Sequence, residues 1–557
     1  MLRKFRIPLA ILTITAVTLL FLGISWQCSL WIGWVAKIQF LPALLALNAG
    51  VLVFLILMTL IFGRIYCSVI CPLGIMQDGF SWLGGKFRKN RFGHVKEKKW
   101  WRYGVLAIFG IALIVGFAPL TTLLAPYSAY GRIVGNLLRP LFDLLHNAAA
   151  SWDATHGGFH FTEVEIWMRS GISLAIAVLT LVILGVWALR KGRAYCNTIC
   201  PVGTFLSLFA RFSLFRVRFD KEKCKKCGLC EKNCKACAID SQSGTVDYSR
   251  CVVCGNCLKL CKFDALHYGI TPHKCKCGPE GSKCGSDDSK CSLENSKCDP
   301  GNSKCGTEHT NDAATSFDDK KNTGTVDTID TGNDTDAGNA TNTENVADTG
   351  NAADTGRRTF LMAAGMAAVT ASVAQTKLKM DGGLAAIEEK KAPKREIPVT
   401  PPGSVSLKHL QRHCTACQLC VSACPNNVLR PSTRLDSLMQ PVMSFERGYC
   451  RPECTRCSQV CPTGAIKPVT PEDKTAIHAG HAVWIKENCL PVKGGVHCGN
   501  CARHCPTGAI QMINYEGKEI PSIDTTKCIG CGACENLCPA RPFSAIYVEG
   551  NEVHHIR

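Results

Sequence analysis

The stretch CTACQLCVSACP at residues 414–425 decides how the C-terminal part of the chain folds, and CIGCGACENLCP at 528–539 repeats it. Both match C-x2-C-x2-C-x3-C-P, in which three closely spaced thiolates hold one [4Fe-4S] cubane and the fourth reaches a neighbouring cubane. A disulfide framework does not need this repeated spacing with a trailing proline, and zinc sites lack the final cysteine–proline pair. The pattern therefore predicts iron–sulfur clusters.

Two further cysteine groups lie between these motifs and have longer first gaps. In all four groups a proline follows the fourth cysteine: Pro425, Pro462, Pro506 and Pro539. Four cubanes are predicted. The four groups are Cys414, Cys417, Cys420, Cys424; Cys450, Cys454, Cys457, Cys461; Cys489, Cys498, Cys501, Cys505; and Cys528, Cys531, Cys534, Cys538.

A compact two-cluster ferredoxin pattern precedes this region, at residues 224–261. The usual crossover of the fourth cysteine predicts one cubane on Cys224, Cys227, Cys230 and Cys261 and another on Cys251, Cys254, Cys257 and Cys234. Lys235 and Lys262 stand where proline is usual. An extra thiol, Cys237, is either a substitute ligand or spare.

Composition fits metal thiolates better than nucleic-acid binding. The 557 residues include 36 cysteines, and the formal net charge is +19. Each cubane with its four thiolates carries roughly two negative charges, so six cubanes would offset about twelve of these positive charges. No C-x-x-C-H occurs, which excludes covalent c-type haem, and no phosphate-binding glycine pattern stands beside a strand and helix.

Four apolar runs in the N-terminal part are long enough to cross a bilayer: residues 7–25, 41–62, 103–125 and 171–189. Basic residues cluster between the second and third runs and after the fourth, whereas the two expected outer loops, 26–40 and 126–169, are sparsely basic. By the positive-inside rule the N-terminus and residue 190 onward lie in the cytoplasm. We expect an inner-membrane, multi-pass protein.

The ends of the second and fourth runs repeat one phrase, GRIYCSVICPLG at 63–74 and GRAYCNTICPVG at 192–203. Each copy keeps two cysteines, Cys67 and Cys71 or Cys196 and Cys200, at a spacing that favours one helical face. Packing alone could explain buried cysteines. We expect a redox or metal role near quinol, in which the four thiols converge on one metal or cluster or act as two dithiols.

From Cys275 the composition changes, with cysteines at every seventh position from Cys277 to Cys305. The spacing lacks the second apolar position of a coiled coil. It is interpreted as a repeat-expanded linker or, alternatively, a soft-metal tract. Residues 306–356 have a composition typical of disorder.

An export signal follows this linker. Arg357 and Arg358, then Phe360 and Leu361, precede a mildly apolar run of small residues and resemble a twin-arginine signal. We expect it to take the C-terminal domain to the outer face, with either cleavage after Ala374 or retention as a further helix. The alternative is a short buried helix.

These motifs together resemble two known families. Residues 1–270 resemble the NapH/MauN family of membrane subunits, and residues 357–557 resemble the NapG/MauM family of exported four-cluster ferredoxins. For the C-terminal domain the resemblance implies nested pairing. One outer cubane would be held by Cys414, Cys417, Cys420 and Cys538, the other by Cys528, Cys531, Cys534 and Cys424, and the inner two by Cys450, Cys454, Cys457 with Cys505 and Cys489, Cys498, Cys501 with Cys461.

The expected fold is multidomain. We expect a four-helix α membrane domain at 1–212, a two-cluster α+β ferredoxin module at 213–272, a cysteine-repeat and disordered linker at 273–356, the signal or anchor at 357–380, and an α+β four-cluster [4Fe-4S] ferredoxin-type domain at 381–557.

The resemblance implies a quinol dehydrogenase-like component with six [4Fe-4S] clusters that passes electrons from the membrane quinol pool to a periplasmic reductase or cytochrome, as in nitrate-reductase systems. A further membrane subunit is expected as a partner. Nucleic acid is not. About 30 Å of hydrocarbon would separate the two ferredoxin regions, with no evident cofactor site between them. The alternatives are a metal-site maturation factor for a respiratory oxidoreductase, and electron entry from a cytoplasmic ferredoxin to quinone.

Overall fold

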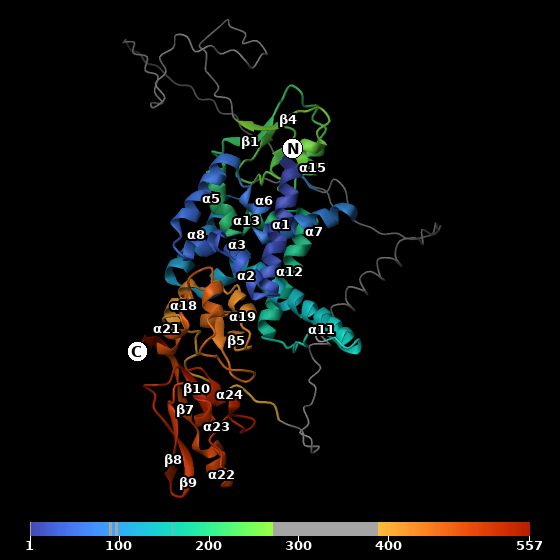
Figure 1. Cartoon of the computed structure of the whole chain (residues 1–557). Coiled ribbons are helices and arrows are strands. Elements are labelled where there is room, and N and C mark those ends of the chain that lie inside the picture. The colour runs from blue at the N-terminus through green and yellow to red at the C-terminus, as the bar shows by residue number, and fades with distance from the viewer. Residues whose placement is uncertain (1, 88–91, 95–98, 159, 271–387, 557) are drawn as a thin grey trace, which may run out of the picture. The chain divides into compact units, whose positions relative to one another are not determined.

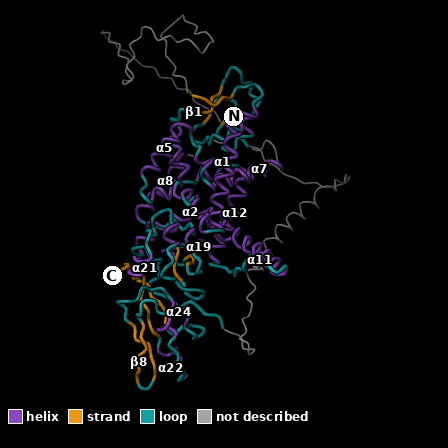
Figure 2. Tube along the Cα trace, viewed as in Figure 1, coloured by secondary structure: helices purple, strands orange, loops and turns teal. Residues whose placement is uncertain are grey.

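A computed structural model describes residues 2–87, 92–94, 99–158, 160–270 and 388–556, which belong to one compact unit (Figure 1). The cysteine repeat from Cys275 and the expected twin-arginine signal lie outside the described residues. Figure 2 shows that the N-terminal part is almost entirely helical, whereas strands and loops dominate the C-terminal part. The helical N-terminal part and the α+β C-terminal part predicted from the sequence are confirmed.

The N-terminal part contains two helices that are long and apolar enough to cross a membrane, α1 and α12. Its elements are α1 (Leu2–Leu22), α2 (Trp26–Ile32), α3 (Trp34–Lys37), α4 (Phe40–Leu45), α5 (Ala49–Phe62), α6 (Tyr66–Val69), α7 (Pro72–Phe87), α8 (Lys99–Val115), α9 (Ala118–Leu124), α10 (Pro126–Ile133), the π-helix η1 (Val134–Leu138), α11 (Arg139–Thr155), α12 (Gly171–Lys191), α13 (Ala194–Thr198) and α14 (Pro201–Ala210).

The other two expected spans are interrupted. The run at 41–62 divides into α4 and α5 because Leu47 has a φ of 53° and Asn48 caps α5 by accepting a hydrogen bond from the Val51 N–H. The run at 103–125 divides into α8 and α9 at Gly116, which has a φ of 83°. Within the described residues, α1 and α12 alone meet the length for a span, so four spans remain a prediction.

The repeated phrase forms the same structure twice. Each copy ends one helix at a glycine, makes a short helix and starts another at a proline, giving α5–α6–α7 and α12–α13–α14. The copies exchange partners, because α7 packs against α12 and α14 packs against α5. Gly63 and Gly192 have φ values of 75° and 62°, which L side chains rarely adopt.

The central module follows α14 directly. Its outer strands β1 (Phe215–Phe219) and β4 (Leu266–Ile270) are antiparallel, with Phe215 opposite Ile270 and Phe219 opposite Leu266. Between them lie α15 (Leu229–Lys232), β2 (Ile239–Asp240), β3 (Thr245–Val246) and α16 (Asn256–Leu260). Each short helix begins within one of the two cysteine groups.

The C-terminal domain is built from short helices at its cysteine motifs and from β-hairpins. Its elements are α18 (Leu407–His413), α19 (Leu419–Ala423), β5 (Leu429–Pro431), η2 (Leu435–Ser437), β6 (Pro441–Met443), α20 (Arg456–Val460), α21 (Pro471–Ala476), β7 (Ile477–Trp484), η3 (Lys486–Asn488), α22 (Leu490–Gly494), α23 (Asn500–Arg503), β8 (Ile510–Tyr515), β9 (Lys518–Ile523), α24 (Ala533–Leu537) and β10 (Ile546–Ile556). Strands β7 and β10 pair antiparallel, with Trp484 opposite Ile546. A buried ion pair between Arg395 and Glu535 joins the start of this domain to α24.

Candidate iron–sulfur and thiol sites

The structure brings together the two cysteine sets expected in the central module. Cys224, Cys227, Cys230 and Cys261 line one cavity. In the second set, burial and then the neighbouring Cys254 raise the pKa of the Cys234 thiol to about 12, and Cys257 interacts electrostatically with the same group. Mutual repulsion of this kind requires the thiols to lie close together. The crossover of Cys234 and Cys261 between the two sets is therefore present in the fold.

The C-terminal domain places four cysteine sets in adjacent pairs. Cys424 lines a cavity with Cys450, Cys454 and Cys457, and Cys538 lines another with Cys489, Cys498 and Cys501. Burial and then Cys417 raise the pKa of Cys414, and Cys461 acts in the same direction. Burial raises the pKa of Cys528, and Cys505 adds to it. The remaining sets are Cys414, Cys417, Cys420 with Cys461, and Cys528, Cys531, Cys534 with Cys505.

This arrangement corrects the nested pairing implied by the family resemblance. The nested order would place Cys538 with the first motif and Cys424 with the last. In the structure α19 of the first motif packs against α20 of the second, and α23 of the third packs against α24 of the fourth. Each fourth cysteine therefore crosses to its neighbour in sequence, as in a two-cluster ferredoxin.

The four C-terminal sets form an ordered series. Cys420 of the first set interacts electrostatically with Cys457 of the second. Cys450 of the second donates its N–H to the Cys531 carbonyl oxygen at 2.9 Å, and Cys534 of the third interacts with Cys501 of the last. Clusters in these sets would lie in a chain of neighbours.

The first of these sets rests on the helical part. The Gln418 amide donates to the Ser173 hydroxyl at 2.7 Å, and the Arg139 guanidinium donates to the Ser422 carbonyl oxygen at 2.6 Å. A Cβ atom on Gly131 would meet the Cys417 carbonyl oxygen at 2.6 Å, so the motif approaches the α10 backbone closely. Ser173 lies in the first turn of α12.

The central module contacts the opposite end of α12. The Arg193 N–H donates to the Lys235 carbonyl oxygen at 2.8 Å, directly beside Cys234. A Cβ atom on Gly192 would meet the same oxygen at 2.4 Å. Since α12 has 21 residues, its two ends are about 31 Å apart. A cysteine set of the C-terminal domain is thus adjacent to the first turn of α12. A cysteine set of the central module is adjacent to its other end.

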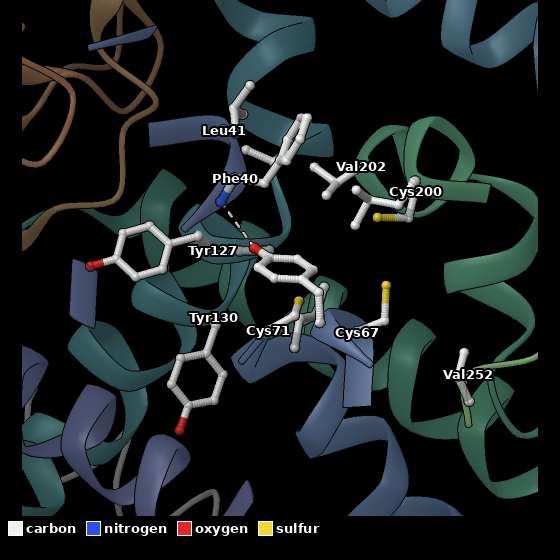
Figure 3. Packing of buried hydrophobic residues seen from close by; sticks show 14 of the residues in the cluster. Phe40, Leu41, Cys67, Cys71, Tyr127, Tyr130, Cys200, Val202 and Val252 are labelled. Atoms are coloured by element: carbon white, nitrogen blue, oxygen red, sulfur yellow. Dashed lines mark hydrogen bonds between the residues drawn. The ribbon is translucent and has the colours of Figure 1, made fainter. Parts of the chain in front are cut away.

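The four thiols of the repeated phrase converge near the second end of α12. Cys67, Cys71, Cys196 and Cys200 are all buried. Cys200 interacts electrostatically with Cys196, Cys71 and Cys67, and Cys71 interacts with Cys196 and Cys67. Figure 3 shows Cys67, Cys71 and Cys200 around one region of the helical core, with Phe40 and Tyr127 nearby. Sequence analysis left open whether the two pairs meet, and the structure brings them together.

Buried charge surrounds these thiols. Arg193 and Arg6 each donate to the Asp78 carboxylate at 2.8 Å, and Lys235 lies 3.5 Å from it. On the other side Arg64 donates to the Asn197 amide oxygen at 2.8 Å and to the Cys196 carbonyl oxygen at 3.1 Å. Sequence analysis did not identify Arg6, Asp78 or the two repeat arginines as site residues. Both copies of the phrase contain an arginine at the same position, and this repetition was the signal in the sequence that could have identified Arg64 and Arg193.

A cleft of about 780 Å³ opens between α1, α7 and the central module. Apolar side chains line one part of it, including Ile7, Ile11 and Trp82. Arg3, Arg6, Asp78, Lys232 and Lys235 line the rest. The cleft therefore joins an apolar helix surface to the backbone next to Cys234, and it has both apolar and charged walls.

Three family models match parts of the chain. Two 4Fe-4S binding domains match residues 44–90 with 172–222 and residues 245–267, and a 4Fe-4S dicluster domain matches residues 413–465 with 496–541. The first of these models spans both copies of the repeated phrase. No solved structure matches the chain significantly.

Several curated proteins are similar to separate parts of the chain. A methylamine utilization ferredoxin-type protein MauN from Paracoccus denitrificans is 28% identical over 180 residues, 31% of this chain and 49% of that protein. MauM from Methylobacillus flagellatus is 34% identical over 158 residues, 27% of this chain and 66% of that protein. The putative electron transport protein YccM from Escherichia coli is 24% identical over 195 residues, 35% of this chain and 47% of that protein.

The chain spans about half the length of most of these relatives. Its MauN-like matches and its MauM-like matches, taken with three iron–sulfur family models, establish the general class. The chain is a ferredoxin-type iron–sulfur protein, and separate parts of it are related to MauN, MauM and YccM.

Proposed function

We propose that this protein conducts electrons from membrane quinol to a redox protein on the outer side of the cytoplasmic membrane. One observation carries the proposal: the first C-terminal cysteine set is adjacent to one end of α12, and a central cysteine set is adjacent to the other. The helix length of about 31 Å matches the hydrocarbon core of a bilayer. The acceptor would be a periplasmic reductase or cytochrome.

Six [4Fe-4S] clusters would form the conduit. The central sets would hold two, and the adjacent pairs of the C-terminal domain would hold four. Their thiolate sets consist only of cysteine, which suits iron–sulfur clusters. Nothing along such a series needs acid–base chemistry, because only electrons move.

Membrane insertion accounts for the exposed apolar side chains of the helices. Leu9, Ile11 and Leu12 of α1 and Leu179 and Val182 of α12 are exposed. Exposed apolar surface of this extent is unfavourable in water but not in lipid. The C-terminal domain would lie outside and the central module inside, in agreement with the positive-inside rule.

The cleft between α1 and α7 is the proposed quinol site. Oxidation of one quinol releases two electrons and two protons and leaves quinone. The site must therefore accept the two electrons and the two protons. The cleft backbone at Asn233 and Lys235 flanks Cys234, a ligand candidate of the nearer central cluster. Electrons would enter there, one at a time.

A bulky side chain in the cleft tests this proposal. A Cβ atom on Gly79 meets no atom within 4 Å, and Gly79 lines the cleft. We expect Gly79→Phe to abolish reduction of the clusters by a menaquinol analogue, because the ring fills the quinol site, while dithionite still reduces them. Electron paramagnetic resonance of the anaerobically purified chain measures both.

Gly104→Phe is the matched control. Gly104 lies in the second turn of another helix, α8, also with free space around its Cβ position, and it does not line the cleft. This variant should be reduced by quinol at the wild-type rate. Wild-type clusters that quinol cannot reduce would refute the proposed function.

A further inference from the structure

The four thiols of the repeated phrase are placed as one ligand set, and we propose that Cys67, Cys71, Cys196 and Cys200 bind a seventh iron–sulfur cluster. This proposal rests on the proposed function and supplies a step that it lacks. The two ferredoxin-type regions lie at opposite ends of α12, too far apart for a single electron transfer. A cluster on the four thiols would supply an intermediate site, because their surroundings contact both regions.

The spacing of the four thiols does not suit a single metal ion. Within the part of the chain that the structure describes, no three histidine, cysteine, aspartate or glutamate side chains are close enough to hold one ion. The ferredoxin-type sets also fail that criterion. A mononuclear site holds its thiolates about 2.3 Å from one metal, whereas the core of a cluster spreads them further apart.

The helix ends favour thiolates at this site. Cys200 is the N-cap of α14, and its sulfur accepts a hydrogen bond from the Gly203 N–H at 3.4 Å. Cys71 immediately precedes Pro72, the first residue of α7. The positive end of a helix dipole stabilises an adjacent thiolate, and α7 and α14 provide one for each copy.

Unbalanced positive charge at the site calls for an anion. Arg64 is fully buried, and among the described residues its hydrogen bonds go to carbonyl and amide oxygens rather than to a carboxylate. One of its terminal nitrogens lies 3.8 Å from the Cys67 sulfur. Arg64 also interacts electrostatically with Cys251 of the second central set, so a cluster on that set would offset part of its charge. A buried cation without enough negative charge around it is strongly unfavourable. A cluster with four thiolates carries roughly two negative charges and would neutralise it.

Unpartnered donors surround the same thiols. The Arg64 Nε, Arg193 Nη2 and Gln77 Nε2 atoms are buried and have no hydrogen-bond partner among the described residues. The Cys196 thiol lies 3.3 Å from the Gln77 amide oxygen. Buried donors of this kind are nearly always satisfied in native proteins. The sulfides of a cluster are acceptors that would satisfy them.

The site has a neighbour on each side. Toward the central module, Asn197 donates to the Ala236 carbonyl oxygen at 3.0 Å, two residues from Cys234. Toward the C-terminal domain, Arg132 interacts electrostatically with both Tyr195 and Cys417. A cluster held by Cys67, Cys71, Cys196 and Cys200 would accept one electron at a time from the central sets and pass it to the first C-terminal set. No bond forms or breaks, and the two electrons of quinol pass singly.

Iron analysis of the full chain tests the proposal. Six cubanes account for about 24 iron atoms per chain, so the anaerobically purified wild type should contain about two to four more, with matching acid-labile sulfide. The variants Cys196→Ser and Cys200→Ser should each lose that surplus and one component of the Mössbauer spectrum. Cys28→Ser is the matched control, because Cys28 belongs to no cysteine set, and it should retain the surplus.

The outcomes separate this inference from the proposed function. Unchanged iron and sulfide in both variants, or zinc or copper lost in place of iron, would overturn the seventh cluster. If a variant does not fold, the wild type alone still decides, because a content of about 24 iron atoms leaves none for this site. A wild type with these clusters that quinol cannot reduce would count against the proposed function instead.

Discussion

The two copies of the repeated phrase have the same thiols and one arginine each, but the two arginines have different partners. Arg193 of the second copy faces the Asp78 carboxylate, which also receives Arg6 and Lys235. Arg64 of the first copy faces Asn197 and backbone oxygens. Duplication thus explains why the four thiols are arranged alike in the two copies. The different partners of Arg64 and Arg193 indicate that the two arginines have different roles. The Asp78 side holds the fold together, and the Arg64 side remains available to an anionic cofactor.

The largest expected effect comes from removing the carboxylate of the second copy. Asp78→Asn leaves Arg6, Arg193 and Lys235 without their shared counter-ion. We expect a loss of stability of about 3–5 kcal/mol, because breaking a buried ion pair strands its partners. Thermal unfolding of the detergent-solubilised protein measures this. A midpoint equal to that of the wild type would contradict the structural task assigned to Asp78.

Substitutions of the glycines that end α5 and α12 should also differ in how much stability they cost. A Cβ atom on Gly192 would meet the Lys235 carbonyl oxygen at 2.4 Å, whereas one on Gly63 would meet the Val253 side chain at 3.1 Å. The Lys235 backbone cannot move aside as the Val253 side chain can. Both glycines have positive φ, so alanine is strained at either position. We expect Gly192→Ala to cost about 2–4 kcal/mol and Gly63→Ala about 1–2 kcal/mol. The reverse order in thermal unfolding would contradict the contact between Gly192 and the central module.

Arg64 should affect redox properties more than stability. Arg64→Gln removes a cation beside the Cys67 sulfur, so it should lower the reduction potential of the seventh cluster by on the order of 100 mV. The carbonyl oxygens it leaves can still accept from the amide of glutamine. Redox titration followed by electron paramagnetic resonance checks this, with the C-terminal clusters as an internal reference. A potential shift shared by all clusters would point to general disruption.

The smallest expected effect comes from making the copies alike in charge. Asn197→Asp gives Arg64 a carboxylate partner and so reduces the positive charge facing the cluster. The potential should shift in the same direction as in Arg64→Gln, but less, since the arginine remains. An upward shift in the same titration would contradict the assigned role of Arg64.

Spacing rules predicted the cysteine sets of the central module, because its crossover follows from two adjacent motifs. They did not predict which C-terminal motifs pair. That depends on the packing of α19 on α20 and α23 on α24, which the spacing does not encode. The length of the apolar runs likewise predicted two helices that are longer than those observed. Leu47 and Gly116 have positive φ, and the helices are interrupted there.

The sequence left open whether the four thiols of the repeated phrase converge or act as two separate pairs. Cys67 and Cys196 are separated by 128 intervening residues, and only the exchange of α7 and α14 between the copies brings them together. The repeated arginine was visible in the sequence. Its task depends on Asp78, which has no counterpart in the second copy, where Ser207 stands in its place.

Rapid-freeze electron paramagnetic resonance after mixing with a menaquinol analogue tests the central claim most directly. In the wild type the central clusters and then the C-terminal clusters should become reduced. In Cys200→Ser the central clusters should be reduced at the wild-type rate while the C-terminal clusters stay oxidised. Reduction of the C-terminal clusters in that variant at the wild-type rate would contradict a path through the four thiols.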